Sequence, residues 1–205
     1  MAVAGLLLAA GAGRRMGGPK ALVRLGGEPL VTRALRVMAG ADLAPLVVVL
    51  GAAADDVRAA LPVGTATVVA AGWETGMGAS LRAGLAELAG SDPATDAVVV
   101  HLVDTPGIGL EALARVAARA RPGVLARGAY GGRPGHPVLL GRDHWEGVAA
   151  AAEGDAGARS YLGTRAEEVE PVEVGDVADP GDVDTPADLE AARRRIGRGT
   201  DGAEV

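Results

Sequence analysis

The chain has 205 residues, of which 49% are hydrophobic and 22% charged, and this size and balance predict one globular domain. Its formal net charge of -6 argues against a general nucleic-acid-binding protein, and the absence of cysteine excludes disulfides, thiolate metal sites and cysteine nucleophiles. No apolar stretch approaches the roughly 18 residues of a membrane span, and the first apolar run is too short for a signal peptide, so we expect a cytoplasmic protein.

The first predicted element is a strand over residues 3–10, which leads directly into a loop rich in glycine and basic residues. This loop, Gly11–Lys20, carries three cationic side chains, those of Arg14, Arg15 and Lys20, on a chain that is acidic overall. Glycine turns can line up successive backbone N–H groups as a concave anion site. The loop therefore predicts a ligand that bears phosphate.

The spacing of this loop differs from the two common phosphate-binding patterns. Gly11 and Gly13 fit the start of the dinucleotide fingerprint, but Met16 stands where its third glycine belongs. A Walker P-loop needs glycine before its lysine and Ser or Thr after it, whereas Pro19 precedes Lys20 and alanine follows. Neither pattern applies.

Strand-like and helix-like runs alternate through the rest of the chain. Nearly continuous apolar runs predict strands at 45–50, 66–71 and 97–103, and helices are predicted at 29–39, 54–61, 79–89 and 109–120. The second half predicts strands at 124–130, 137–140 and 169–174, and short helices at 142–149 and 156–163. A last helix begins after Thr185, its predicted cap. This order predicts an α/β domain over residues 1–196, a doubly wound, mostly parallel sheet in three layers, followed by a disordered tail over 197–205.

A second glycine-rich segment, residues 72–81, joins the third predicted strand to the third helix. Gly76 and Gly78 predict a turn that a ligand can approach closely. Ser80 could hydrogen-bond a base or a ribose, or it could simply cap the helix.

Two carboxylates are expected at the carboxyl edge of the sheet. Asp104 follows the strand over 97–103, where it could hold Mg²⁺ or cap the next helix. Asp184 precedes the last helix and could be a second carboxylate for the metal or a purely structural residue.

The part of the site that would bind a second substrate, the acceptor of a transferred group, is less well signalled. Residues 130–137 read as a rigid loop in which His136 could orient an acceptor phosphate, assist proton removal, or have no role. Asp155 or Arg159 could lie near the same acceptor. His101, inside a predicted strand, reads as a core histidine with its hydrogen bonds satisfied.

Six segments occur in a fixed order from about residue 5 to residue 192: LAAGAGRRMGGPKAL, GMGASLRAGL, VDTP, GRPGHPVLLG, GDAGAR and DVDTPADL. As an ordered set they resemble the MobA-like nucleotidyltransferase family, and most closely its molybdenum cofactor cytidylyltransferase branch. The resemblance implies a Rossmann-like nucleotidyltransferase fold. It also implies Mg²⁺-dependent transfer of CMP from CTP to a phosphorylated small molecule such as molybdopterin, with release of pyrophosphate.

The resemblance also implies roles for particular residues. The catalytic residues would be Lys20 and Arg14, which hold the phosphates, and Asp104, which carries the metal with Asp184. The nucleotide would contact Ala9, Ala10, Gly11, Gly13, Arg14, Lys20, Gly78 and Ser80. The acceptor would contact His136, Arg133 and Asp155.

Other functions remain open. Close cytidylyltransferases often have Asp-Gln-Pro where this chain has Asp104-Thr105-Pro106. Chains with the latter turn also resemble proteins called nicotine blue oxidoreductase, so an NAD(P)H-dependent reductase on a similar scaffold is one alternative. Others are a transferase with a different base or acceptor, and a nucleotide-binding module without catalysis.

Overall fold

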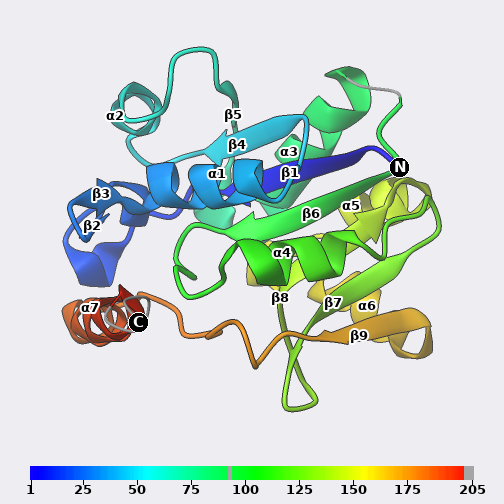
Figure 1. Ribbon diagram of the computed structural model, residues 1–205. Coiled ribbons are helices and arrows are strands. Elements are labelled where there is room, and N and C mark those ends of the chain that lie inside the picture. Colours follow the sequence, from blue (N-terminus) through cyan, green and yellow to red (C-terminus); the bar gives the residue numbers. More distant parts are fainter. Residues whose placement is uncertain (92–93, 201–205) are drawn as a thin grey trace.

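The structure, a computed structural model, describes residues 1–91 and 94–200, and of residues 196–200 only the backbone. Seven strands form one sheet in the order β5-β4-β1-β6-β8-β7-β9 (Figure 1). In that order they are β5 (Ala66–Val69), β4 (Leu46–Leu50), β1 (Val3–Leu8), β6 (Ala97–Leu102), β8 (Arg133–Gly141), β7 (Leu125–Tyr130) and β9 (Val169–Glu173). Every neighbouring pair is parallel except the two that involve β8.

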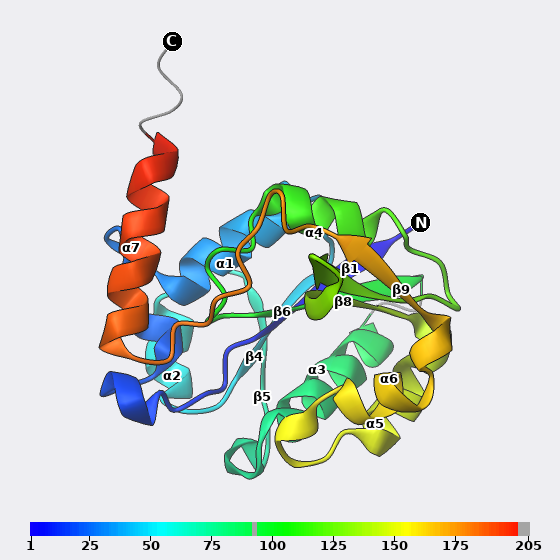
Figure 2. The same ribbon diagram turned by 90° about the horizontal axis from the view of Figure 1, so that it is seen from below.

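Helices cover both faces of the sheet, which gives the expected three layers (Figure 2). One face carries α1 (Leu30–Gly40) and α4 (Leu110–Ala117), and the other carries α3 (Met77–Ser91), α5 (Trp145–Ala151) and α6 (Arg159–Thr164). The other α-helices are α2 (Ala54–Ala59) and α7 (Pro186–Thr200), and β2 (Arg24–Leu25) and β3 (Glu28–Pro29) form a small hairpin; short 3-10 helices lie in several of the connections. The predicted doubly wound, mostly parallel α/β fold is confirmed.

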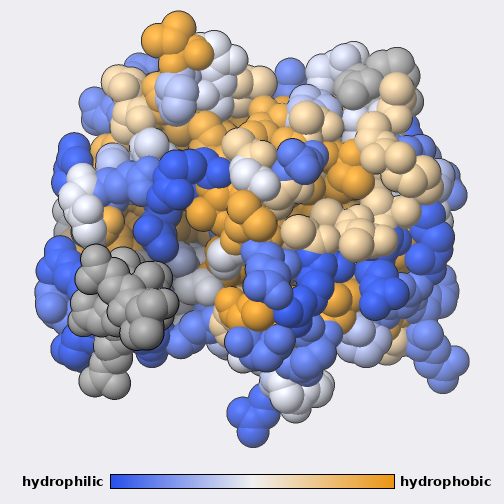
Figure 3. Space-filling model, in the orientation of Figure 1, coloured by the Kyte–Doolittle hydropathy of each residue, from blue (hydrophilic) through white to orange (hydrophobic). Residues whose placement is uncertain are grey.

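The sheet is buried on both faces, as its apolar runs predict. Alternate residues of each central strand point to opposite faces, so that Leu7 and Val99 pack under α1 and α4, whereas Leu6 and Val98 pack against α3. On the face shown in Figure 3, hydrophobic residues form a band across the middle and upper part of the molecule, and hydrophilic residues gather below it and at its edges. Within the part of the chain that the structure describes, no helix is both long and apolar enough to cross a membrane.

The hairpin of β7 and β8 differs from the prediction in one respect that affects the site. β8 begins at Arg133, so Arg133 and His136 belong to a strand and not to a loop. The reason is the turn: Gly131 and Gly132 have φ of 58° and 78°, the left-handed conformation that a two-residue hairpin turn requires. Pairing therefore starts at once, with Tyr130 opposite Arg133.

The last helix begins as predicted. Thr185 Oγ1 accepts a hydrogen bond from the backbone N–H of Asp188, and the Asp188 carboxylate accepts one from the N–H of Thr185. The helix continues to Thr200, past residue 197, where the sequence predicts the start of a disordered tail. Residues 201–205 of that predicted tail lie outside the described residues.

Candidate active site

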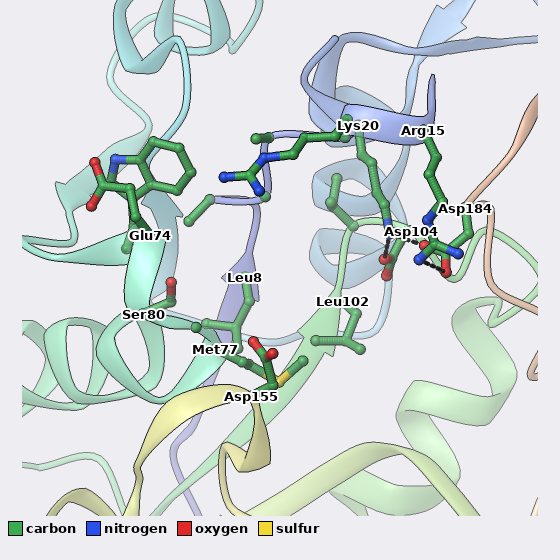
Figure 4. A pocket seen from close by; sticks show the side chains of 18 residues that line it. Leu8, Arg15, Lys20, Glu74, Met77, Ser80, Leu102, Asp104, Asp155 and Asp184 are labelled. Atoms are coloured by element: carbon green, nitrogen blue, oxygen red, sulfur yellow. Dashed lines mark hydrogen bonds and ion pairs between the residues drawn. The ribbon is translucent and has the colours of Figure 1, made fainter. Parts of the chain in front are cut away.

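A cavity of about 480 Å³ opens at the carboxyl ends of β1 and β6. This is the edge at which doubly wound sheets bind their ligands. The residues around it come from the glycine-rich loop after β1, the start of α3, the end of β6 and two later turns (Figure 4). They are Leu8, Ala10, Gly11, Ala12, Gly13, Arg14, Arg15, Lys20, Trp73, Glu74, Gly76, Met77, Ser80, Leu102, Val103, Asp104, Asp155 and Asp184.

The glycine-rich loop is folded back on itself around Gly13. The carbonyl oxygen of Gly13 accepts hydrogen bonds from the backbone N–H groups of Met16, at 2.8 Å, and Gly18, at 3.3 Å. Gly13 has φ of 58°, and a Cβ at this position would lie 2.0 Å from the Gly18 carbonyl oxygen. Only glycine fits there. By contrast, a Cβ on Gly11 would meet nothing within 4 Å.

Lys20, at the end of this loop, connects the two predicted metal carboxylates. Its Nζ lies 2.6 Å from Oδ2 of Asp104 and is also ion-paired with Asp184. Arg15 Nη2 reaches the other oxygen of Asp184 at 3.0 Å. Burial by itself would lower the pKa of Lys20, but its hydrogen bonds to the two carboxylates outweigh that effect and raise it. The hydrogen bond from Lys20 in turn lowers the pKa of Asp184.

Backbone contacts explain why Asp104 and Asp184 meet. Asp104 lies two residues after Leu102, where β6 ends. The backbone carbonyl oxygen of Asp104 accepts a 2.8 Å hydrogen bond from the N–H of Val183. This bond pins the C-terminal segment to the edge of the sheet just before Asp184. Asp104 does not cap the next helix, because α4 begins at Leu110 with Gly109 as its cap residue. The capping alternative for Asp104 is therefore wrong.

The chemistry of these carboxylates fits a divalent cation that is shared with a nucleotide. Asp104 and Asp184 already direct their oxygens at one cationic group, the Lys20 ammonium. Nowhere in residues 1–91 and 94–200 do three or more His, Asp or Glu side chains form a group that could hold a metal. Mg²⁺ usually takes one or two carboxylates and completes its shell with substrate phosphates and water. Two carboxylates beside a cationic, glycine-rich loop match that pattern.

The start of α3 forms the end of the cavity away from Lys20. Because α3 starts at Met77, Ser80 is within the helix, which excludes the alternative that it caps the N-terminus. Ser80 is 4% exposed and lines the cavity. Figure 4 shows Ser80 and Glu74 on the side of the cavity away from Lys20 and Asp104.

Glycine also brings Asp155 to the cavity. Gly76 has φ of 124°, and a Cβ there would lie 2.4 Å from the backbone of Gly154. The loop before α3 and the turn Gly154–Ala156 can therefore touch, and Asp155 of that turn reaches the cavity wall.

Most of the predicted site residues line this one cavity: Ala10, Gly11, Gly13, Arg14, Lys20, Ser80, Asp104, Asp155 and Asp184. Ala9 and Gly78 do not line the cavity but belong to the packing around it. Ala9 is buried and donates its N–H to Val49, and Gly78 packs against the Ala152 backbone, which a Cβ would approach to 2.7 Å. Arg133 and His136 are not among the lining residues.

Two histidines lie in the sheet beside the cavity. His101 is buried in β6 as predicted, but its Nδ1 has no hydrogen-bond partner, so the expectation of satisfied hydrogen bonds is wrong. Nδ1 of His136 is likewise buried without a partner. Burial lowers the pKa of His136 to about 4, helped by the charge of Arg127 and opposed by Asp104.

Arg15, a cation of the glycine-rich loop, and Trp73 and Glu74, which the sequence offers only as weaker candidates, also line the cavity. The signal for Arg15 was present, because it belongs to the same cationic loop as Arg14. Trp73 and Glu74 lie in the segment before α3, where nothing in the local pattern shows which side chains face inward.

This fold and cavity define an α/β protein whose candidate ligand site lies at the carboxyl edge of its sheet. The family model of the MobA-like NTP transferase domain matches residues 5–169, and the chain belongs to this family.

Three relatives show the range of proteins that share this scaffold. The chain is 36% identical over 192 residues to nicotine blue oxidoreductase of Paenarthrobacter nicotinovorans, which covers 89% of this chain and 92% of that protein. It is 35% identical over 147 residues to molybdenum cofactor guanylyltransferase of Rhodobacter capsulatus, 71% of this chain and 66% of that protein. A Mycobacterium tuberculosis protein solved in complex with manganese is 28% identical, with a TM-score of 0.76 over 95% of this chain and 99% of that one.

Proposed function

We propose that this protein is a Mg²⁺-dependent nucleotidyltransferase that transfers CMP from CTP to a phosphorylated small molecule, molybdopterin being the first choice, and releases pyrophosphate. The observation that carries the proposal is the convergence of Lys20, Asp104 and Asp184 at the rim of a phosphate-binding loop. A loop lysine beside two carboxylates suits a triphosphate and its cation. The family and the manganese-containing neighbour support the same chemistry.

In the proposed reaction, a phosphate oxygen of the acceptor attacks the α-phosphorus of the nucleotide. A bond forms between that oxygen and the phosphorus, and the bond from the α-phosphorus to the oxygen that bridges to the β-phosphate breaks. Pyrophosphate leaves with the bonding electron pair. Mg²⁺, held by Asp104 and Asp184, would supply positive charge against the phosphates. Arg14 and Lys20 would orient the departing phosphates, so that catalysis consists mainly of positioning and charge neutralisation.

The choice of CTP rests on the ordered motifs, which resemble the cytidylyltransferase branch, whereas the name of the Rhodobacter relative favours a guanylyl donor. The test is pyrophosphate release with Mg²⁺ and molybdopterin, with CTP, GTP and ATP compared side by side. We expect the highest kcat/KM with CTP. Preference for GTP would change the base and keep the reaction, whereas no pyrophosphate with any nucleotide would refute the proposal.

A reductase is the second candidate, because the Paenarthrobacter relative has an oxidoreductase name and aligns over nearly its whole length. A reductase that uses NAD(P)H has no need for a pair of carboxylates beside a triphosphate loop. Oxidation of NAD(P)H coupled to reduction of a quinone-like dye, without pyrophosphate release, would favour this candidate. A thermal-shift screen with CTP and NADPH gives an independent reading, since a ligand that binds the native state raises the melting temperature.

A further inference from the structure

One face of the sheet continues the cavity toward β8 and β7. Leu8 and Leu102 line the cavity and are paired across β1 and β6. In β8, Val138 pairs with Val100, and the ring of His136, two residues before Val138, is hydrogen-bonded to the backbone of Val100. Leu8, Leu102 and Val138 all belong to the apolar cluster under α3, α5 and α6. His136 therefore lies against β6, close to the row of side chains that starts at the cavity.

Arg127 comes next in this row. It lies two residues after Leu125, which belongs to the same apolar cluster, so its side chain leaves the same face of β7. Its Nε lies 3.4 Å from the carbonyl oxygen of Gly135, directly before His136. Arg127 is half-buried, and its pKa is lowered by burial and by the charge of Arg159. The charges of both arginines also lower the pKa of His136.

Arg159 joins this group from the other layer. It is the first residue of α6, four residues after Asp155, which lines the cavity. Figure 4 shows Asp155 and Leu102 on the same side of the cavity. Within residues 1–91 and 94–195, neither Arg127 nor Arg159 forms an ion pair with a carboxylate. Arg159 is exposed, whereas Arg127 is partly desolvated beside a second positive charge, and an anion bound between the two would relieve that repulsion.

We infer that Arg127 and Arg159, with His136 beside them, form the subsite that binds the anionic group of the acceptor, a phosphate monoester. The inference extends the proposed function and rests on it, because only a transferase has an acceptor substrate. A guanidinium group can donate two parallel N–H hydrogen bonds to two oxygens of one phosphate, which orients the phosphate as well as attracting it. The subsite adjoins the floor of the cavity at Leu102 and Asp155, so a phosphate bound there faces the nucleotide. In this assignment Arg127, and not Arg133 as the resemblance implies, is the arginine that contacts the acceptor.

Inorganic phosphate is a suitable probe, and histidine NMR is a suitable readout. The chain has three histidines, so each imidazole C2–H resonance can be followed separately and assigned by substitution. We expect phosphate to shift the His136 resonance in a saturable way, because an anion beside the ring changes its electric field. His101, on the other face of the sheet, and His144 should move little. Arg127→Gln and Arg159→Gln should each weaken the phosphate affinity reported by His136 at least tenfold.

Three variants make the test specific. Arg14→Gln removes a cation from the nucleotide loop and should leave the His136 response in place. Arg119→Gln, an exposed arginine after α4 on the opposite side of the sheet, is the matched control and should behave as wild type. Arg159 is exposed, so its variant should fold even if Arg127→Gln does not. A His136 resonance that ignores phosphate, or a response lost in Arg133→Gln and kept in Arg127→Gln, overturns the inference.

The test of the anion subsite and the test of the proposed function can fail independently. An Arg127-dependent shift without pyrophosphate release from any nucleotide would keep the anion subsite and reject the transferase. Pyrophosphate release without the shift would keep the transferase and reject the anion subsite. If both stand, Arg127→Gln and Arg159→Gln should raise the KM for the acceptor at least tenfold and change the KM for CTP less than twofold.

Discussion

Nζ of Lys20 lies 2.6 Å from Oδ2 of Asp104, a residue 84 positions further along the chain. The same ammonium also pairs with Asp184, so without a nucleotide it occupies the oxygens that a divalent cation would use. In the proposed site, lysine and metal would therefore compete for one pair of carboxylates. The phosphates of a nucleotide give the lysine another partner, so metal and nucleotide should bind together more readily than either does alone.

Lys20→Met should therefore separate metal binding from catalysis. Mn²⁺ should bind more tightly to the nucleotide-free variant than to wild type, because a positive charge has left the carboxylates. Transfer should nevertheless slow by roughly 10²–10³, the loss typical when one preorganised charged or hydrogen-bonding contact to the reacting group is removed. Electron paramagnetic resonance of free Mn²⁺ measures the first effect and pyrophosphate release the second.

Arg36→Met is the matched control for Lys20→Met, because it removes a cation from an ion pair with Glu28, a residue that does not line the cavity. It should alter neither Mn²⁺ affinity nor transfer. Weaker Mn²⁺ binding by Lys20→Met would show that the lysine helps to build the metal site and does not compete for it.

Asp104→Asn should raise the Mg²⁺ concentration that gives half-maximal transfer about tenfold or more, because a neutral amide is a poorer ligand for a hard cation. Folding should change little, since partly exposed ion pairs contribute at most about 1 kcal/mol. The measurement is a Mg²⁺ titration of initial rates, with Asp176→Asn, from an exposed pair with Arg115, as the control. An unchanged titration curve would remove Asp104 from the metal site.

Gly13→Ala and Gly17→Ala test how the phosphate loop is held. Both glycines have left-handed φ, but only at position 13 would a Cβ collide with the backbone. Gly17→Ala should cost about 1–2 kcal/mol of unfolding free energy through φ alone. Gly13→Ala must open the loop, so it should also weaken CTP binding at least tenfold. Urea unfolding and calorimetric titration with CTP distinguish the two effects, and equal behaviour of the two variants would argue against the Gly13 turn as the element that shapes the loop.

Acid should destabilise the protein through His101. Burial lowers its pKa to about 3, helped by the charge of His136, whereas in the unfolded chain its pKa is near 6.5. Below pH 6.5 the unfolded state therefore takes up a proton that the folded state does not. The unfolding free energy should fall by about 1.4 kcal/mol per pH unit for this group as the pH drops toward 4.

His101→Leu should reduce the slope of unfolding free energy against pH by about that amount. Urea denaturation at pH 4.5, 5.5 and 6.5 measures it. If the variant and wild type lose stability in parallel over this range, His101 is not the group that takes up the proton.

The local pattern of residues determined the scaffold and the phosphate loop. Continuous apolar runs predicted the buried parallel strands, and the Gly11–Lys20 loop combines glycine and cations within ten residues, so it needs no distant contact to be recognised. Asp104 could be placed at the edge of the sheet because the apolar run over 97–103 predicts a strand that ends directly before it.

Only the tertiary structure decided which distant side chains meet. The hydrogen bond from Val183 to the Asp104 carbonyl brings Asp184 to Lys20, and no local pattern specifies that contact. The two-glycine turn at Gly131 and Gly132 extended β8 to Arg133 and carried His136 into the sheet beside Arg127. Periodicity and propensity report the shape of a chain over a few residues, whereas long-range contacts depend on how whole elements pack. For that reason the cationic loop and the place of Asp104 could be predicted from the sequence, whereas the contact between Arg127 and the strand that carries His136 could not.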